Sequence, residues 1–234
     1  MVFEKLDKRI IISGTIEAVT PLHIGSGKSE VELGEVDMPI LRDPSGQPYI
    51  PGSSLKGRVR AEAEKIARKM GMDVCEPPDV NSMCGSKKGR VEDFCICCRI
   101  FGTAGKISLA SKVKFRDAYP LERVESLLER TGIAIDRKTG AVAKGALYTI
   151  EAVPAGTKFG LEIVAENLSD EELKLLKAAL RSVEDSALGG SSTRGFGKVK
   201  ITIESVRERT AGYYLGKEEE QVITGEELKR WLQS

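Results

Sequence analysis

The start of one predicted helix combines residue types that bind anions. Between Pro48 and Arg60, two prolines and a Gly-Ser-Ser turn precede a helix that opens with three cationic side chains. The hydroxyl and cationic candidates are Ser53, Ser54, Lys56, Arg58 and Arg60. Because a helix N-terminus already carries partial positive charge, cations there are unfavourable unless an anion lies among them. Backbone N–H groups, hydroxyls and cations together suit phosphate; a capped surface helix with solvated cations is the alternative.

A glycine-rich stretch from Leu188 to Ile201 has residue types that suit the same kind of ligand. Its glycines let the backbone approach a ligand closely. Arg194 and Lys198 can reach phosphate, and Phe196 can pack beneath a ligand or stack on it. The alternative is a mobile connection between a helix and a strand. In a ferredoxin-like fold this stretch and the helix start can converge, which would give one long anion-binding groove.

Five cysteines lie in one short window of the chain and suit a metal site. Cys95 and Cys98 have the C-x-x-C spacing that brings two thiolates to one metal ion. Cys75 and Cys84 would complete a tetrahedral set, and Cys97 would be left over. In a cytosolic protein such a cluster favours a metal over disulfides. Free buried thiols are the alternative.

Two isolated residues are weaker candidates for chemistry. His23 is the only histidine, which excludes an acid/base pair of histidines and a histidine-rich metal site. A lone histidine beside glycine and serine is more often a hydrogen-bonded structural residue. Asp37 lies in a short predicted loop between apolar residues, where an aspartate alone is usually a turn residue.

Composition limits the classes of protein that these residues can belong to. The chain has 234 residues, of which 41% are hydrophobic, so it can form one large domain or two small ones. The sequence has no apolar run of the roughly 20 residues that a membrane helix needs, and its N-terminus does not match a signal peptide. We therefore expect a cytoplasmic protein without membrane contacts. The net charge of +1 argues against an indiscriminate nucleic-acid binder.

The elements that would position these residues follow from periodicity and capping signals. The predicted order is strand, helix, strand, strand, helix, strand, with insertions, which is the split βαβ plan. A capping box, Ser169-x-x-Glu172, opens the clearest helix, and Ser53 or Ser54 would cap the helix discussed above. The other predicted elements are a strand reaching about Thr20, a short strand at 38–42, a strand at 106–117, a short helix at 121–130, three strands within 131–166, a strand after Gly197 and a helix at 224–233.

Several of these stretches together resemble a known family. LHIGSG and LGEVDMPILRDPSGQPYIPGSSLKGRVR resemble the N-terminal signature of the RAMP-type backbone subunits of type III CRISPR–Cas effector complexes. Later blocks resemble the Csm-type backbone subunit in the same order: CRIFGTAG, KVKFRDAYP, IDRKTGAVAKGALYTIEAVPAGTKF and LGGSSTRGFGKVKI. The resemblance covers nearly the whole chain, and the five ordered blocks are specific as a set.

The resemblance implies an architecture and a set of partners. The fold would be α+β, an RRM-like (ferredoxin-like) palm with insertions, a β-hairpin thumb and a zinc-binding insertion. We expect one RAMP domain over residues 1–234, a Cys-rich subdomain at 71–98 and the thumb at 131–150. Copies of the chain would stack along a guide crRNA with other type III effector subunits. The thumbs would interrupt the pairing of guide and target RNA at six-nucleotide intervals.

The resemblance also assigns roles to residues. Asp37 matches the family's aspartate that cleaves target RNA with Mg²⁺ or another divalent cation. The expected RNA contacts are His23, Ser53, Ser54, Lys56, Arg58, Arg60, Gly190, Ser191, Arg194 and Lys198. The expected ligands of a structural Zn²⁺ are Cys75, Cys84, Cys95 and Cys98. With a single histidine, the expected route is attack of a ribose 2′-OH on the adjacent phosphate, with Asp37 positioning the metal or taking the proton.

Two other functions fit the same residues. One is a structural RNA-binding filament subunit that does not cleave RNA, and the presence of Asp37 argues against it. The other is a guide-processing endoribonuclease, which the lack of paired histidines and the match to the backbone-subunit blocks disfavour. The cysteine-rich insertion is not general in the family, although some members carry a zinc-binding insertion near this place.

Overall fold

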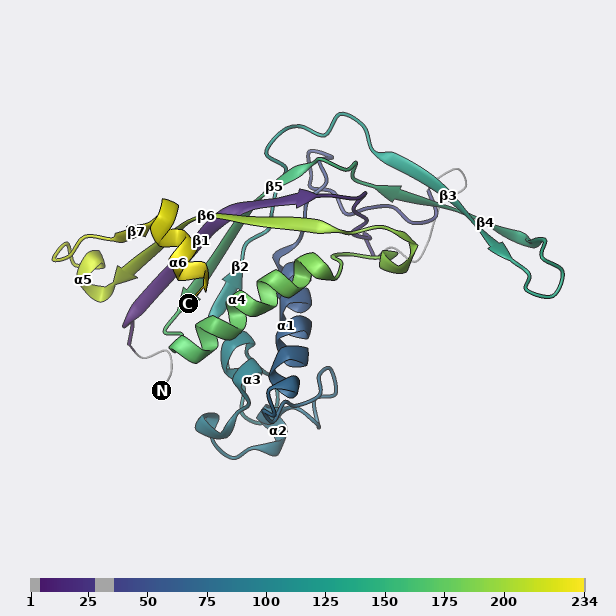
Figure 1. The fold of residues 1–234 in the computed structure, drawn as a ribbon. Coiled ribbons are helices and arrows are strands. Elements are labelled where there is room, and N and C mark those ends of the chain that lie inside the picture. Colours follow the sequence, from purple (N-terminus) through teal and green to yellow (C-terminus); the bar gives the residue numbers. More distant parts are fainter. Residues whose placement is uncertain (1–4, 28–35, 234) are drawn as a thin grey trace.

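A five-stranded antiparallel sheet forms the centre of the molecule (Figure 1). The computed structural model describes residues 5–27 and 36–233. The strand order is β2-β5-β1-β6-β7. The strands are β1 (Lys8–Ala18), β2 (Val113–Phe115), β5 (Lys158–Glu166), β6 (Val199–Thr210) and β7 (Gln221–Ile223). Strand β1 is therefore the middle strand of the sheet, and it pairs along its length with β5 on one side and β6 on the other.

The alternation predicted for the first strand is confirmed in β1. Ile10, Ile12 and Ile16 are almost fully buried, because alternate residues of a strand face the same side of the sheet. Gly14 interrupts this pattern at a bulge, where a Cβ atom would lie 2.0 Å from the carbonyl oxygen of Thr202 in β6. A glycine is therefore required for the two backbones to approach this closely.

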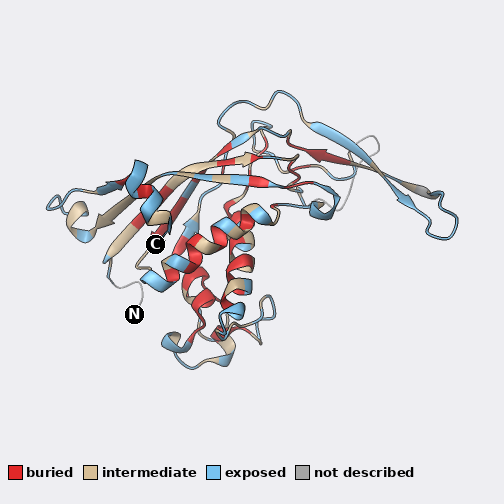
Figure 2. Ribbon diagram, in the orientation of Figure 1, coloured by how far each residue is buried: buried red, intermediate tan, exposed pale blue. Residues whose placement is uncertain are grey.

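Two helices pack against each other on one face of the sheet. They are α1 (Gly52–Lys69) and α4 (Asp170–Asp185), and Figure 2 shows their buried faces turned inward. The predicted capping box of α4 is present: Glu172 N donates to Ser169 Oγ, and Ser169 N donates to the Glu172 carboxylate. The buried stripe of α1 comprises Leu55, Val59, Ala63 and Ala67.

The remaining described helices are short. The cysteine-rich region contains α2 (Cys84–Lys87), the 3₁₀ turn η1 (Val91–Asp93) and α3 (Ile96–Phe101). The glycine-rich stretch contains η2 (Ser192–Arg194), and the C-terminal part contains α5 (Ala211–Tyr214) and α6 (Gly225–Gln233). Within the described ranges, no helix combines the length and the apolar character needed to cross a membrane.

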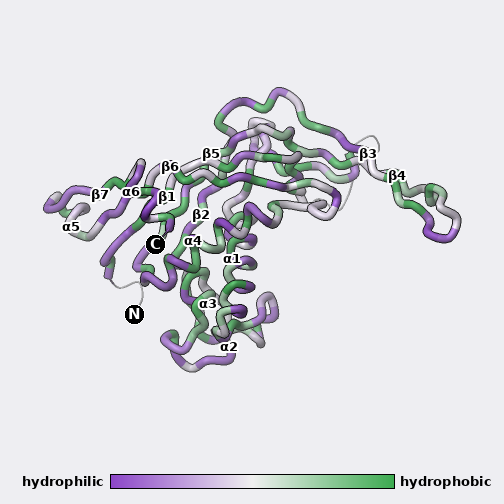
Figure 3. Tube along the Cα trace, in the orientation of Figure 1, coloured by the Kyte–Doolittle hydropathy of each residue, from purple (hydrophilic) through white to green (hydrophobic). Residues whose placement is uncertain are grey.

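A two-stranded hairpin projects from the sheet (Figure 1). It consists of β3 (Leu128–Ile135) and β4 (Val142–Ala152), so its strands begin before and end after the predicted range of 131–150. Figure 3 shows hydrophobic stretches on this projecting ribbon. Its exposed apolar side chains are Leu128, Ile133, Ile135, Val142 and Leu147. Exposed apolar side chains on a projecting element are typical of a surface that contacts another molecule.

The short strand predicted at 38–42 makes only isolated bridges. Three further expectations about local structure are wrong or too long. The predicted helix at 121–130 is extended chain that runs into β3. Leu121 is 57% exposed, so a helix here would lack a buried apolar face. The backbone N–H and carbonyl of Val124 bond with the Gln47 side chain instead of with other backbone groups of a helix. The strand predicted at 106–117 shrinks to β2, because only its end pairs with β5.

The third correction concerns the cap of α1. Neither Ser53 nor Ser54 caps the helix, because the N-cap residue is Pro51 and it provides no side-chain bond. Instead the Asp117 carboxylate accepts a hydrogen bond of 2.7 Å from Gly52 N. An acidic side chain at this position satisfies one free N–H group and complements the helix dipole.

We expect the two capping residues of α4, Ser169 and Glu172, to contribute different amounts to the stability of the protein. Ser169→Ala removes one cap and should lower the free energy of unfolding by about 1 kcal/mol. Glu172→Ala should cost more, roughly 3 kcal/mol, because Glu172 also pairs with Lys112 at 2.7 Å and is almost fully buried. Urea unfolding checks this, with exposed Glu171→Ala as the control; equal costs for the two variants would contradict the ranking.

Candidate functional site

Asp37 lies at the base of the projecting hairpin. Its exposed carboxylate accepts a hydrogen bond of 2.7 Å from Thr149 N in β4. The next residue, Met38, also bonds to the backbone of β4. Met38 N donates to Thr149 O at 3.1 Å, and Glu151 N donates to Met38 O at 3.0 Å. The carboxylate that the resemblance marks as catalytic is therefore held against β4 and faces solvent.

A cavity lined by cationic and aromatic side chains lies at this same end of the hairpin. It has a volume of about 370 Å³. The Arg194 guanidinium lies 5.1 Å from the centre of the Tyr148 ring, and that of Arg130 lies 5.2 Å from the Phe196 ring. The lining residues are Arg130, Thr131, Gly132, Ile133, Tyr148, Ile150, Arg194 and Phe196. Planar cationic and aromatic groups of this kind can stack with nucleobases.

Sequence reasoning selected Arg194 and Phe196 in this cavity but missed its hairpin residues. Tyr148 precedes Thr149, which binds Asp37, so the cavity adjoins the carboxylate along β4. Gly132 lies opposite Tyr148 in the hairpin, and a Cβ atom there would meet the Tyr148 ring at 2.3 Å. Tyr148 lay on a strand of the predicted hairpin, but Arg130 lay in the helix predicted at 121–130, and only the observed register of β3 and β4 brings them to one cavity.

His23 is buried and joins two parts of the site. Its Nδ1 lies 2.7 Å from the carbonyl oxygen of Glu151, and because a carbonyl only accepts, Nδ1 carries the proton. Its own carbonyl accepts a hydrogen bond of 2.8 Å from Gly190 N. At Gly189, which has a φ of +80°, a Cβ atom would lie 2.2 Å from His23 O. The histidine thus links β4 to the glycine-rich loop.

The glycine-rich loop exposes three of its four residues that are predicted to contact RNA. Gly190, Arg194 and Lys198 are exposed, and Ser191 is half-buried in the left-handed conformation with a φ of 57°. In Figure 1 this loop follows the end of α4, which lies at the same end of the helical layer as the start of α1. The two stretches predicted to bind anions therefore share one end of the molecule.

The predicted cations of α1 have different surroundings. Lys56 is half-buried, and burial together with the nearby charge of Arg60 lowers its pKa. Arg58 pairs with Glu62 at 3.3 Å one turn further along the helix. Ser53 is exposed and Ser54 half-buried at the start of the helix. The helix start thus presents hydroxyl and ammonium groups, while its guanidinium groups are partly neutralised.

Arg60 points toward the cysteine-rich region. Its Nε donates to Glu64 at 2.8 Å, Nη1 donates to Gly102 O at 3.0 Å, and Nη2 lies 3.7 Å from the Cys98 sulfur. Its side chain is 16% exposed. RNA binding by Arg60 stays a prediction, and the contacts seen here connect it with the cysteines.

Four cysteine sulfurs form a compact cluster that could hold a metal ion such as zinc. The Sγ atoms of Cys75, Cys84, Cys95 and Cys98 all lie within 4.8 Å of one another. Four thiolates in this arrangement match the ligand set of a closed structural zinc site. The hydrogen bond from Cys98 lowers the pKa of Cys95 to about 4, so one thiolate is already favoured. These four are the residues that the sequence predicted.

Cys97 lies outside this cluster. It is fully buried in the core, and burial raises its pKa to about 12. The structure therefore agrees with the prediction that Cys97 is the cysteine left over.

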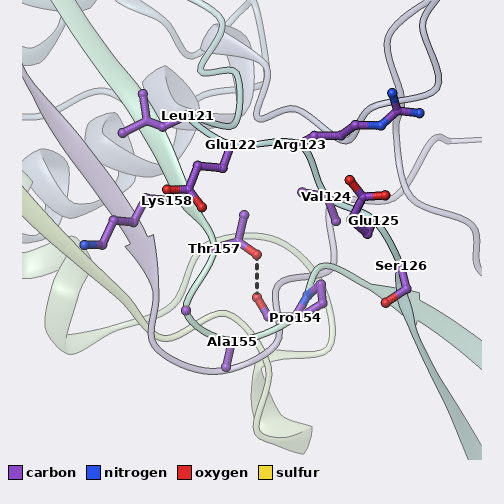
Figure 4. Close-up of a pocket in the computed structure, with 11 residues that line it drawn as sticks. Leu121, Glu122, Arg123, Val124, Glu125, Ser126, Pro154, Ala155, Thr157 and Lys158 are labelled. Atoms are coloured by element: carbon purple, nitrogen blue, oxygen red, sulfur yellow. Dashed lines mark hydrogen bonds between the residues drawn. The ribbon is translucent and has the colours of Figure 1, made fainter.

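A second cavity, of about 570 Å³, lies between the segment that enters β3 and the turn between β4 and β5 (Figure 4). Its walls are residues 121–126 and 154–158, and Thr157 Oγ1 donates to Pro154 O across its floor. Its lining includes two acidic residues, Glu122 and Glu125, and two basic ones, Arg123 and Lys158, so it has no excess of positive charge that would favour phosphate. None of the residues predicted to bind RNA or metal is among its lining residues in the described chain.

Comparison with known proteins gives a consistent result. Residues 15–200 match the model of the RAMP superfamily. The CRISPR system endoribonuclease Csm3 of Methanothermobacter thermautotrophicus is 34% identical over 94% of both chains. Csm3 of Methanocaldococcus jannaschii is 34% identical over 91% of this chain and 86% of its own.

Solved structures agree in fold. A Csm3 chain was solved in a Csm3–Csm4 subcomplex of the type III-A CRISPR–Cas interference complex. It superposes with a TM-score of 0.60 at 27% identity over 97% of this chain and 96% of its own. Methanopyrus kandleri Csm3 gives a TM-score of 0.59 at 26% identity, over 90% of this chain and 80% of its own.

We expect the cysteine cluster to bind one zinc ion that stabilises the fold. Cys95→Ser should abolish stoichiometric zinc in the purified protein and lower its melting temperature, because structural zinc contributes directly to folding. Cys97→Ser should retain zinc, since Cys97 lies outside the cluster. Metal analysis and thermal unfolding check both variants. Full zinc content in Cys95→Ser would contradict the ligand assignment.

Proposed function

Because this chain belongs to the RAMP superfamily and, within it, to the Csm3 family, we propose that it cleaves target RNA through Asp37. The chain is an endoribonuclease and a backbone subunit of a type III CRISPR effector complex. The observation that carries the role of Asp37 is its place at the hairpin base, beside a cavity suited to nucleobases.

The proposed reaction is attack of a ribose 2′-OH on the adjacent phosphate. It requires the 2′-oxygen, phosphorus and leaving 5′-oxygen to lie in line, a geometry that a kinked RNA strand can supply. Asp37 would take the 2′-OH proton or hold a divalent cation, and its exposed carboxylate suits either role. A divalent cation such as Mg²⁺ would offset charge on the phosphate oxygens. The products would be a 2′,3′-cyclic phosphate and a 5′-hydroxyl.

The structure limits how a divalent cation could bind. Among the described residues, the cysteine cluster is the only group of three or more potential ligands. Asp37 would thus contribute one carboxylate, and the remaining ligands would be RNA oxygens and water. We therefore propose that this cation binds only together with RNA. The zinc proposed for the cysteine cluster would be structural.

Guide RNA is proposed to lie along the glycine-rich loop and the start of α1. Ser53, Ser54 and Lys56 would line one part of this path. Gly190, Ser191, Arg194 and Lys198 would line the other, with the buried His23 against Gly190. The protein would contact backbone and shape, while base pairing between guide and target supplies sequence specificity. A net charge of +1 is compatible with this role because the contacts concentrate in one groove and copies stack through complementary faces.

We also propose that the palm belongs to the RRM-like, or ferredoxin-like, class. The chain order β1-α1-β2-β5-α4-β6 corresponds to βαββαβ, and the sheet order β2-β5-β1-β6 supports this assignment. The hairpin β3–β4 would then be the thumb, inserted between the second and third strands of the palm. The structural filament subunit and the guide-processing enzyme are the less favoured alternatives.

We expect Asp37→Asn to abolish target cleavage in the assembled complex. The variant keeps an acceptor for Thr149 N but loses the charge, so cleavage should fall at least about 100-fold while guide and target stay bound. The matched control is Asp79→Asn, because exposed Asp79 also accepts a backbone hydrogen bond, from Asn81 N at 3.0 Å, in the cysteine-rich region. Cleavage is measured with Mg²⁺ and with EDTA. Unchanged products from Asp37→Asn would remove Asp37 from the mechanism.

We expect the aromatic cavity to contribute to RNA binding by stacking. Tyr148→Ala should weaken target binding by about 1–3 kcal/mol, whereas Tyr148→Phe keeps the ring and should bind like the wild type. Filter binding of labelled target RNA to the assembled complex measures both variants. Equal weakening by Tyr148→Phe would show that the hydroxyl, and not ring stacking, matters.

A further inference from the structure

Glu151 is a buried carboxylate that no role assigned above uses. It lies in β4, and its side chain is 7% exposed. One carboxylate oxygen accepts a hydrogen bond of 3.0 Å from Ile40 N, and the other forms a close ion pair with Arg42. Both partners belong to the segment that follows Asp37. A carboxylate removed from water requires such partners, since an unpaired buried charge is strongly unfavourable.

The backbone of the same residue makes two further bonds to the site. Glu151 N donates to Met38 O at 3.0 Å, and Glu151 O accepts from His23 Nδ1 at 2.7 Å. His23 in turn accepts from Gly190 N through its carbonyl oxygen. Glu151 therefore joins the segment that carries Asp37, the buried histidine and, through that histidine, the glycine-rich loop.

The segment that carries Asp37 depends on such bonds because a continuous ladder does not hold it. Its described residues make isolated bridges: Met38 with Ile150, Ile40 with Gly25, and Arg42 with Pro48. The bonds of the Glu151 side chain supplement these bridges at two alternate residues. Removing them would leave the position of Asp37 less restrained, while the palm sheet would keep its own strand pairs.

We infer that Glu151 is a positioning residue for the cleavage reaction, which fixes the 37–42 segment against β4 so that the Asp37 carboxylate meets the scissile phosphate. This inference rests on the proposed role of Asp37. A displacement of about 1 Å at a reacting group can lower a rate about 100-fold. Stability alone explains the pair poorly, since the cost of desolvating the buried Glu151 carboxylate offsets its attraction to the partly exposed Arg42. The exposed part of Arg42 also places positive charge beside the segment.

The test compares Glu151→Gln with wild type in the assembled effector complex. Glutamine still offers an oxygen to Ile40 N but cannot form the ion pair with Arg42. At saturating target RNA, the single-turnover cleavage rate should fall at least tenfold, while guide content and target Kd stay within twofold of wild type. The matched control is Glu162→Gln, which removes an ion pair between exposed side chains, Glu162 and Arg116, from strand β5. It should cleave at the wild-type rate.

A second variant and a second readout separate positioning from general destabilisation. Arg42→Gln removes the same ion pair from the other side and should slow cleavage similarly, so it carries the test if Glu151→Gln fails to assemble. Hydrogen exchange should accelerate in the 37–42 segment of both variants and stay unchanged in β1 and α4. Wild-type cleavage by assembled Glu151→Gln, or by Arg42→Gln where Glu151→Gln does not assemble, would overturn the inference. So would a slower rate accompanied by faster exchange throughout the palm.

Asp37→Asn, measured in parallel, distinguishes failure of this inference from failure of the proposed function. If Asp37→Asn is inactive and Glu151→Gln cleaves normally, only the positioning role is wrong. If Asp37→Asn cleaves normally, the proposed function fails first and the positioning role fails with it.

Discussion

Strand β4 is the constraint on which the rest of the site depends, because it serves two structures at once. It pairs with β3 from Val142 to Ala152, and the outer part of this pair forms the projecting hairpin. At its inner end, Ile150 and Ala152 are buried, and Val153 bridges to Leu22 of the palm. Its inner residues also hold the Asp37 segment, through Thr149 and Glu151. A strand that is anchored in the core and extends into the hairpin can fix a carboxylate at the boundary between them.

Charge compensation explains how a nearly neutral chain can present a cationic path. Many basic side chains near the predicted groove have an acidic partner within the chain, such as Arg42 with Glu151 and Arg58 with Glu62. The start of α1, whose excess of cations suggested a missing anion, is in part neutralised by Asp117. In the proposed RNA path, the exposed positive charge therefore comes mainly from two residues of the glycine-rich loop, Arg194 and Lys198. RNA binding by this chain would then depend more on the positions of its charged side chains than on its net charge.

Local signals in the sequence predicted the local structure well, and the site only in part. The alternation of β1, the capping box of α4 and the four clustered cysteines each follow from short-range spacing, and each is present. The predicted helix at 121–130 is wrong because no part of the described core lies where its apolar side chains could pack as a helix. The spacing of those residues in the sequence does not reveal this. Tyr148 and Glu151 were missed for a related reason. Their roles depend on the register of β4 against β3 and against the segment after Asp37, which only the tertiary structure specifies.

The cysteine-rich region contacts helices α1 and α4, so it would act on the proposed RNA path through α1 and not through the proposed cleavage site. Arg60 reaches from α1 to the Cys98 sulfur and to Gly102 O, and Arg99 of α3 pairs with Glu172 at the start of α4. A metal that orders the four thiolates would therefore fix both helices of the layer that covers the sheet. Asp37 is held separately, by β4, on the side of the palm where the hairpin begins. Loss of the proposed metal should then weaken folding and the end of α1 that is proposed to bind guide RNA before it disturbs the carboxylate, because no described bond links the cysteines to the Asp37 segment directly.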